Sequence, residues 1–155
     1  WIRQEFTFHD IQRLLFRLAE HVKAFGGLTP AEIADLLGAA EKCTYAAGAY
    51  IVKEGFVGTH MYIILNGTAR VVKNGRDGEV ELARLEPADS FGEMALADNE
   101  ARSASVIAED ECILVRLNDQ TIHIKPDIGL KVYRNIAKVL SSRLRAADEL
   151  LAWRL

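Results

Sequence analysis

The chain has 155 residues, 50% of them hydrophobic and 26% charged, with a formal net charge of −3. This length and composition are those of one soluble globular domain with a sizeable core, and they exclude an intrinsically disordered segment. The slightly acidic balance argues against broad non-specific binding to nucleic acid. No apolar run approaches the roughly 18 residues of a transmembrane helix, and no signal-peptide pattern is present, so we expect no membrane contact by this chain. Because the chain begins with Trp1 rather than Met, we interpret it as a piece of a longer protein.

The residues that usually carry redox, metal or nucleophilic chemistry are sparse. Cys43 and Cys112 lie far apart, each inside an apolar run. One disulfide and two reduced core thiols both fit this placement; we favour reduced thiols and, with them, a cytoplasmic location. The four histidines have no Cys or carboxylate at ligand spacing, and no serine has a His–Asp arrangement beside it. We therefore expect no metal, no cofactor and no enzymatic activity.

Residues 1–40 are predicted to form N-terminal helices. Between residues 7 and 24, apolar residues recur at helical spacing opposite a charged face, and the stretch FGGLTP then ends this helix. Thr29, Pro30 and Glu32 match a capping box with proline at the first helical position, which predicts a second, short helix. We expect the first helix to pack on the central domain or on the C-terminal helix.

Residues 41–125 change to short β-branched and aromatic runs separated by glycine-containing turns. This pattern is typical of a small antiparallel barrel or jelly roll. The stretch KNGRDGE lies between two alternating runs and gives the clearest hairpin signal.

Residues 126–155 are predicted to form a long C-terminal helix with two apolar stripes. The first is a heptad-like seam, and the second lies beside it from Leu140 to Leu151. The seam consists of Val132, Ile136, Val139, Arg143, Ala146 and Leu150. A helix with two stripes can pack on its own domain and on a partner at once, so we expect a homodimer contact; the alternative is that the seam is entirely intradomain core.

The stretch FGEMALADNEARSASV, residues 91–106, places one acid and one base in a mostly apolar segment. GEMAL consists largely of good helix formers, and the start of a helical turn offers free backbone N–H groups to an anion. Arg102 follows Glu93 by nine residues and can fold back over the same place. A guanidinium pairs with phosphate oxygens and a carboxylate accepts from a sugar hydroxyl, so the arrangement suits a ribose phosphate.

The same stretch resembles the phosphate-binding cassette of cyclic nucleotide-binding domains, the family of catabolite activators and protein kinase A regulatory subunits. The resemblance rests on Phe91 to Leu96 and on Arg102 to Val106, and it extends upstream to the glycines at 48, 55, 58 and 67. It covers roughly residues 22–150. It implies a single α+β domain over 1–155, in which an antiparallel jelly-roll barrel with a short cassette helix lies between N-terminal helices and a long C-terminal lid or dimer helix.

The resemblance also implies roles for individual residues. Arg102 would pair with the cyclic phosphate and Glu93 would accept from the ribose 2′-hydroxyl, with amides near Ala95 and Ser103 completing the cradle. Arg143 on the C-terminal helix would reach the base as a lid residue. The ligand-binding residues implied are Gly92, Glu93, Met94, Ala95, Arg102, Ser103, Ala104, Val71, Leu82 and Arg143, with Val106 as a further barrel wall.

The position of Ser103, directly after the Arg, favours cyclic AMP, with cyclic GMP as the alternative. Three residues depart from the family pattern: Ala101 replaces a common Pro, Ala88 replaces a common Gly, and Phe56 replaces an acidic residue of an early turn. They bear on rigidity rather than on ligand contacts.

These implications predict a sensory regulatory module whose C-terminal helix moves to control an output domain of a larger parent protein or a dimer partner. A second hypothesis is the ligand-sensing part of a catabolite activator-like transcription regulator; this chain lacks a helix-turn-helix and should not bind nucleic acid alone. A third is a ligand-free structural or dimerisation domain in which Glu93 and Arg102 form a structural ion pair. An enzyme is the weakest hypothesis.

Overall fold

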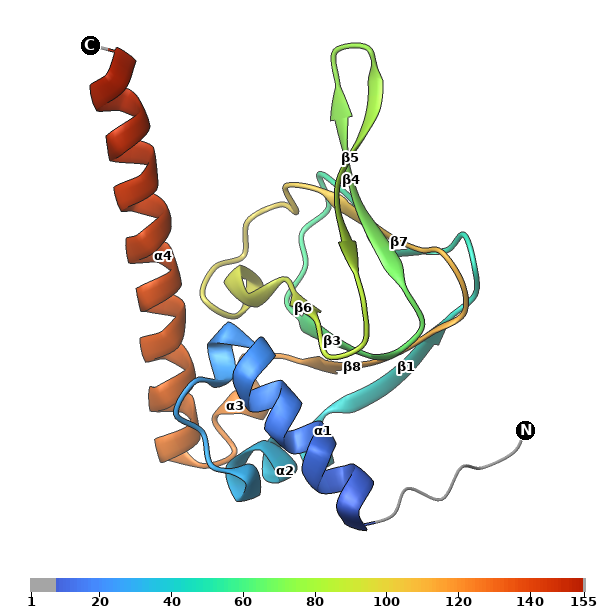
Figure 1. The fold of residues 1–155 in the computed structure, drawn as a ribbon, viewed down its shortest axis with the longest axis vertical. Coiled ribbons are helices and arrows are strands. Elements are labelled where there is room, and N and C mark those ends of the chain that lie inside the picture. Colours follow the sequence, from blue (N-terminus) through green and yellow to red (C-terminus); the bar gives the residue numbers. More distant parts are fainter. Residues whose placement is uncertain (1–7, 155) are drawn as a thin grey trace.

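The computed structural model describes residues 8–154; the first residue of the predicted N-terminal helix, Thr7, lies outside this range. Helices lie at both ends of the chain, with two antiparallel sheets between them, as the sequence predicts (Figure 1). The helices are α1 (Phe8–His21), α2 (Pro30–Ala39), α3 (Asp119–Ile122) and α4 (Pro126–Arg154), with 3-10 turns η1 (Lys23–Phe25) and η2 (Glu93–Leu96). The strands are β1 (Glu41–Tyr45), β2 (Tyr50–Val52), β3 (Met61–Asn66), β4 (Ala69–Gly75), β5 (Gly78–Leu85), β6 (Ser90–Phe91), β7 (Ser105–Ala108) and β8 (Cys112–Leu117).

The strands form two four-stranded sheets with the orders β1-β8-β3-β6 and β2-β7-β4-β5. All pairs are antiparallel, which is the arrangement predicted for a jelly-roll barrel. The predicted hairpin joins β4 to β5, where Gly75 pairs with Gly78, and it projects from the barrel (Figure 1).

Strand β3 separates two hydrophobic clusters. Its side chains alternate in direction, so Met61 and Ile63 belong to the cluster under the helices, whereas Tyr62 and Ile64 belong to the cluster inside the barrel. All four are buried, which explains why this strand is apolar without the alternation expected of a half-exposed sheet. The barrel is thereby fixed to the helical part of the domain along one strand.

Helix α1 packs directly on α2 and η1, and its Leu18 belongs to a buried cluster shared by the barrel strand β3 and the C-terminal helix. Leu18 and Val22 lie in the same buried cluster as Val132 and Ile136 of α4. The predicted capping box of α2 is present, with Thr29 Oγ1 accepting from the Glu32 amide at 3.2 Å. Glu32 also pairs with Lys131 Nζ at 2.7 Å, and this contact joins α2 to α4. The pKa of Glu32 is lowered chiefly by that hydrogen bond.

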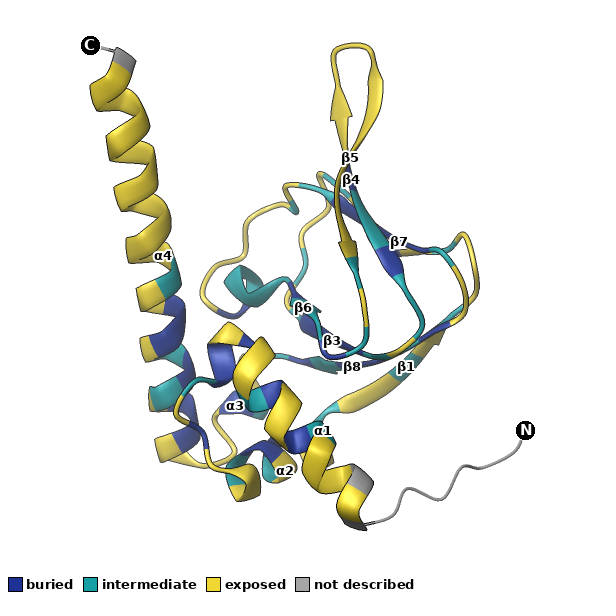
Figure 2. Ribbon diagram, viewed as in Figure 1, coloured by how far each residue is buried: buried dark blue, intermediate teal, exposed yellow. Residues whose placement is uncertain are grey.

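Only the first half of α4 packs on the domain. Val132 and Ile136 are buried, but residues 140–153 are exposed without exception (Figure 2). The alternative that the seam is entirely intradomain core is therefore wrong: beyond Val139 the helix leaves the hydrophobic core, and the seam residues Ala146 and Leu150 are exposed.

Both cysteines are free thiols, and Cys112 Sγ donates to the Thr68 carbonyl at 3.1 Å. Burial raises the pKa of both thiols. Among residues 8–154, no helix combines the length and apolarity needed to cross a membrane.

Asn135 is a buried polar residue that joins α4 to η1, since its Nδ2 donates to the carbonyls of Ala24 at 3.0 Å and Gly26 at 2.7 Å. We predict that Asn135→Leu lowers the free energy of unfolding by ~1–3 kcal/mol, because two carbonyls lose their donor. Urea denaturation measures this change. The control Lys138→Gln, at an exposed position of the same helix, should stay within ~0.5 kcal/mol. An equal effect of the two changes would contradict the assigned role.

Candidate functional site

The predicted cassette is the segment that joins β6 to β7, and it contains η2 followed by a loop. Gly92 begins η2 in a left-handed conformation with φ +79°, which residues with a Cβ rarely adopt. The predicted short helix of GEMAL is a single 3-10 turn, and the Ala95 amide is used inside it, donating to the Gly92 carbonyl at 3.0 Å. Leu96 is buried and its carbonyl accepts from the Tyr133 hydroxyl of α4 at 2.8 Å. The cassette is thus anchored to the C-terminal helix.

The backbone of Arg102 is held by the loop that joins β2 to β3. The Gly55 amide donates to the Arg102 carbonyl and the Arg102 amide donates to the Phe56 carbonyl, each at 2.9 Å. The guanidinium Nη2 donates to the His60 carbonyl at 2.7 Å. Loop 53–59 and the cassette are therefore one hydrogen-bonded unit around this residue.

Two glycines make room for the Arg102 side chain. A Cβ at Gly58 would lie 2.3 Å from Arg102 Nε, and a Cβ at Gly92 would lie 2.5 Å from Nη1. Atoms cannot approach so closely without displacement, so the guanidinium is seated between two stretches of backbone that must both lack a side chain at these points.

The charge of Arg102 has no carboxylate partner within residues 8–154. Its Nε is buried without a hydrogen-bond acceptor, and desolvation lowers the pKa of the guanidinium below its ordinary value. The side chain nevertheless stays charged, because a guanidinium is not deprotonated in proteins. A half-buried cation without a counter-ion is unfavourable unless an anion pairs with it. The site therefore favours an anionic ligand.

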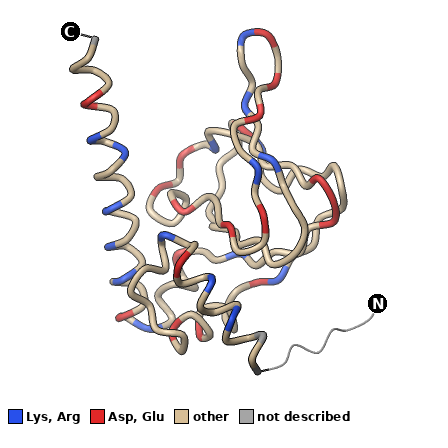
Figure 3. Tube along the Cα trace, viewed as in Figure 1, with Lys and Arg blue, Asp and Glu red and all other residues tan. Residues whose placement is uncertain are grey.

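Glu93 pairs with Arg143, not with Arg102. Basic residues recur along α4 (Figure 3), and Arg143 Nη2 reaches Glu93 Oε1 at 3.1 Å. The Glu93 side chain is 21% exposed and that of Arg143 62%. The hypothesis of a structural Glu93–Arg102 ion pair is therefore wrong, since the acid is joined to the C-terminal helix and the cation of the cassette remains unpaired.

A cavity of about 510 Å³, here called the cassette cavity, lies between the cassette, β4 and α4. It brings together every implied ligand-binding residue except Leu82. The residues that line it are Val52, Val71, Ser90, Phe91, Gly92, Glu93, Met94, Ala95, Asp98, Glu100, Ala101, Arg102, Ser103, Ala104, Val106 and Arg143.

Leu82 does not line the cavity, and a β-bulge is the reason. The pairing of β4 with β5 passes from Val71 opposite Ala83 to Val72 opposite Glu81, which leaves Leu82 as the extra residue. Its side chain is 56% exposed. An alternating pattern along β5 does not reveal a bulge, so the sequence could not show that Leu82 lies outside the lining of this cavity.

The sequence analysis missed several lining residues. Phe91 belongs to the cassette motif itself, and Val52 is an apolar residue of a predicted strand, so both carried a weak signal. Asp98 and Glu100 lie in the loop between η2 and β7, where nothing in the spacing marks them. The buried hydroxyl of Ser105 is structural instead: it accepts from the Glu54 amide at 2.9 Å.

Comparisons with known proteins identify the same region. The family model described as cyclic nucleotide-binding domain matches residues 42–123. The cyclic AMP receptor protein of Thermus thermophilus is 35% identical over 126 residues, which are 80% of this chain and 58% of that protein. A cAMP-dependent protein kinase regulatory subunit of Aspergillus niger is 31% identical over 125 residues, 76% of this chain and 30% of that protein. The chain thus spans less than two thirds of either relative.

Solved structures agree with this. The catabolite activator protein of Thermus thermophilus has a TM-score of 0.73 and 33% identity, and the match covers 84% of this chain and 62% of that one. The regulatory domain of Toxoplasma gondii protein kinase A, solved with cAMP, has a TM-score of 0.68 and 26% identity over 85% of this chain and 50% of that one.

The packing of the Arg102 guanidinium against Gly92 can be tested by comparing two glycines of similar backbone conformation. Gly92 and Gly48 have φ of +79° and +84°, but a Cβ at Gly48 meets nothing within 4 Å. We predict that Gly48→Ala lowers the free energy of unfolding by the left-handed strain alone, ~1–2 kcal/mol. Gly92→Ala should lower it further, because the new methyl displaces the guanidinium. Urea denaturation of both variants gives the difference, and equal losses would contradict the proposed packing.

Proposed function

This chain belongs to the cyclic nucleotide-binding domain family, and we propose that it binds cyclic AMP in the cassette cavity as the sensory module of a larger regulatory protein. The observation that carries the proposal is the half-buried charge of Arg102, which has no carboxylate partner within the described residues. A cyclic phosphate carries one negative charge and two exocyclic oxygens, which match the paired donors of a guanidinium.

Glu93 supplies the second proposed contact with the nucleotide, after that of Arg102. Its carboxylate borders the same cavity as Arg102, so a ribose whose phosphate lies on the guanidinium presents its 2′-hydroxyl to this acid. Amides at the start of η2 have no partner inside the turn, and they add donors for the phosphate. Val52, Val71 and Val106 give the cavity apolar walls for the sugar and the base.

The Glu93–Arg143 contact suggests how binding is transmitted. This ion pair joins α4 to the cassette, with Arg143 Nη2 3.1 Å from Glu93 Oε1. The ribose hydroxyl competes for Glu93, which frees Arg143 to turn to the base and lets α4 change its position. A ligand shifts such an equilibrium only by its differential affinity for the two states. Tyr133, which donates to the cassette carbonyl of Leu96, gives the movement a second point of attachment.

Two features support a preference for cyclic AMP. Ser103 is exposed and lines the cavity directly after the phosphate-binding Arg102. The two relatives described above are both named for cyclic AMP. Cyclic GMP is the competing ligand, and the ratio of the two affinities decides between them.

The output is proposed to pass through α4 to a further domain or to a partner. The similarity to a receptor protein of which the chain spans 58% fits the ligand-sensing part of a transcription regulator, and we propose no DNA binding by this chain alone. We assign it no catalytic role. Both thiols are free, which fits a reducing compartment, and we place the module in the cytoplasm.

Calorimetric titration tests the binding site. We predict that Arg102→Ala weakens cyclic AMP binding by at least ~10-fold, since hydrogen bonds to a charged group contribute ~1.5–3 kcal/mol each. Arg102→Lys, which keeps the charge but loses the paired donors, should weaken it less. The control Arg76→Ala, in the exposed turn between β4 and β5, should leave the affinity unchanged. Unaltered binding in Arg102→Ala, or none in the wild-type chain, would contradict the proposal.

We also propose that a second copy of the chain covers the exposed half of α4. Leu140, Leu144 and Leu151 form one stripe there, exposed by 46%, 65% and 60%. Such a stripe on a helix that extends beyond its own domain suits a parallel partner helix.

Sedimentation velocity tests the homodimer. We predict that the wild-type chain sediments as a dimer and that Leu151→Asp converts it to a monomer, because a carboxylate would be buried between the helices. Ser142→Asp, on the opposite side of α4, should leave the dimer intact. A wild-type monomer at the highest concentration measured, or equal effects of both changes, would exclude this interface.

A further inference from the structure

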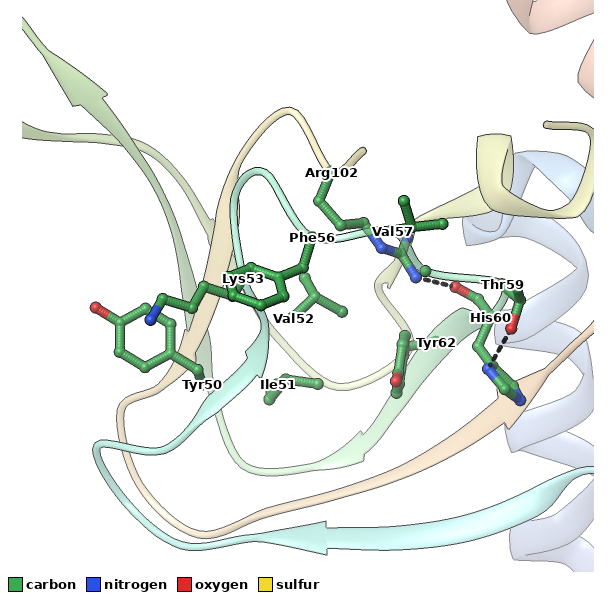
Figure 4. A pocket seen from close by; sticks show the side chains of 11 residues that line it. Tyr50, Ile51, Val52, Lys53, Phe56, Val57, Thr59, His60, Tyr62 and Arg102 are labelled. Carbon is green, nitrogen blue, oxygen red and sulfur yellow. Dashed lines mark hydrogen bonds between the residues drawn. The ribbon is translucent and has the colours of Figure 1, made fainter. Parts of the chain in front are cut away.

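A second cavity, here called the loop cavity, adjoins the cassette cavity and has a volume of about 370 Å³ (Figure 4). It is formed by β2, loop 53–59 and the start of β3, and it shares Val52 and Arg102 with the cassette cavity. A stacked pair of rings links the two linings. Tyr62 lines the loop cavity and Phe91 lines the cassette cavity, with their centroids 5.1 Å apart.

The loop cavity combines aromatic rings with cations. Tyr50, Phe56 and Tyr62 line it, and Lys53 Nζ lies 5.6 Å from the centroid of the Tyr50 ring and 5.5 Å from that of Phe56. Figure 4 shows Lys53 and Phe56 at one end of this cavity and Arg102 toward the other. Tyr50 and Phe56 are 47% and 62% exposed, so both residues reach solvent beside Lys53.

No acid among the described residues lines this cavity. Glu54 is adjacent in sequence, but its carboxylate accepts from the Asn74 amide at 3.0 Å and lies 4.0 Å from Lys73 Nζ, so it is engaged by β4. His60 cannot compensate this charge, because an imidazole is either neutral or positive; burial lowers its pKa and favours the neutral ring. Lys53 and Arg102 therefore leave the cavity with an uncompensated positive charge.

Exposed aromatic rings beside Lys53 and Arg102 favour a ligand that has both a flat ring and a negative group. A flat ring stacks on Tyr50 or Phe56, and a negative group pairs with Lys53. Inorganic phosphate would lack the ring, and a neutral aromatic molecule would lack the charge. The volume is within the range of small-molecule sites.

We propose that the loop cavity is a second ligand site, distinct from the cyclic nucleotide site, which takes a small planar aromatic carboxylate. Its occupant acts on Arg102 through the loop, because Gly55 and Phe56 hold the backbone of Arg102 by two hydrogen bonds. If this ligand changes the affinity of the chain for the nucleotide by some factor, the nucleotide changes the affinity for this ligand by the same factor.

The test uses 2-naphthoate as the probe and the ligand-free chain, so it does not depend on nucleotide binding. In amide NMR spectra we expect 2-naphthoate to shift resonances of residues 50–62 and the amide of Arg102. Lys53→Gln and Phe56→Ser should each raise the dissociation constant of the probe by ~3-fold or more. The neutral analogue 2-naphthamide should bind the wild-type chain more weakly than 2-naphthoate by a similar factor. The control Lys23→Gln, at an exposed site of η1, should change nothing.

Several results would overturn the proposal. If resonances of residues 50–62 do not move, or if both variants bind the probe as the wild type does, there is no such site. Equal affinity for 2-naphthamide would exclude the charge contact. Shifts in loop 53–59 without a shift of the Arg102 amide would exclude the coupling. The spectra themselves report whether each variant is folded.

Discussion

Arg102 carries a positive charge into the space between two loops, where no carboxylate of residues 8–154 pairs with it. Its Nε is buried without an acceptor, and its Nη2 donates to the backbone carbonyl of His60. The guanidinium lies close to the backbone on two sides, and Gly58 and Gly92 leave room for it because neither has a Cβ. The left-handed start of η2 and the hydrogen bonds of loop 53–59 both lie against this residue.

The C-terminal helix is the other half of the arrangement. Its first turns are fixed by Asn135 and by the buried seam, whereas its last turns have no neighbour among the described residues. Arg143 lies between the buried part and the exposed part of the helix, and it pairs with Glu93 of the cassette. A contact at the point where a helix leaves its domain is well placed to be exchanged, because little else holds that turn.

Much of this could be predicted from the sequence. The capping box at Thr29, the hairpin between β4 and β5 and the cassette from Phe91 to Val106 are local signals, and local signals survive without tertiary context. The seat of Arg102 could not be predicted, since Gly58 is 44 residues away and only the fold brings it there. The β-bulge at Leu82 could not be predicted either, because a bulge changes the register of a strand without changing its composition. Ala88 was noted as an unusual replacement for glycine, and its φ of +74° explains why glycine suits that position.

A crystal structure of the chain with cyclic AMP tests the central claim most directly. The account predicts the cyclic phosphate within hydrogen-bonding distance of the Arg102 guanidinium, the ribose 2′-hydroxyl on Glu93, and Arg143 released from its 3.1 Å contact with that acid. A nucleotide bound elsewhere, or bound in the cassette cavity with its phosphate away from Arg102, would contradict it.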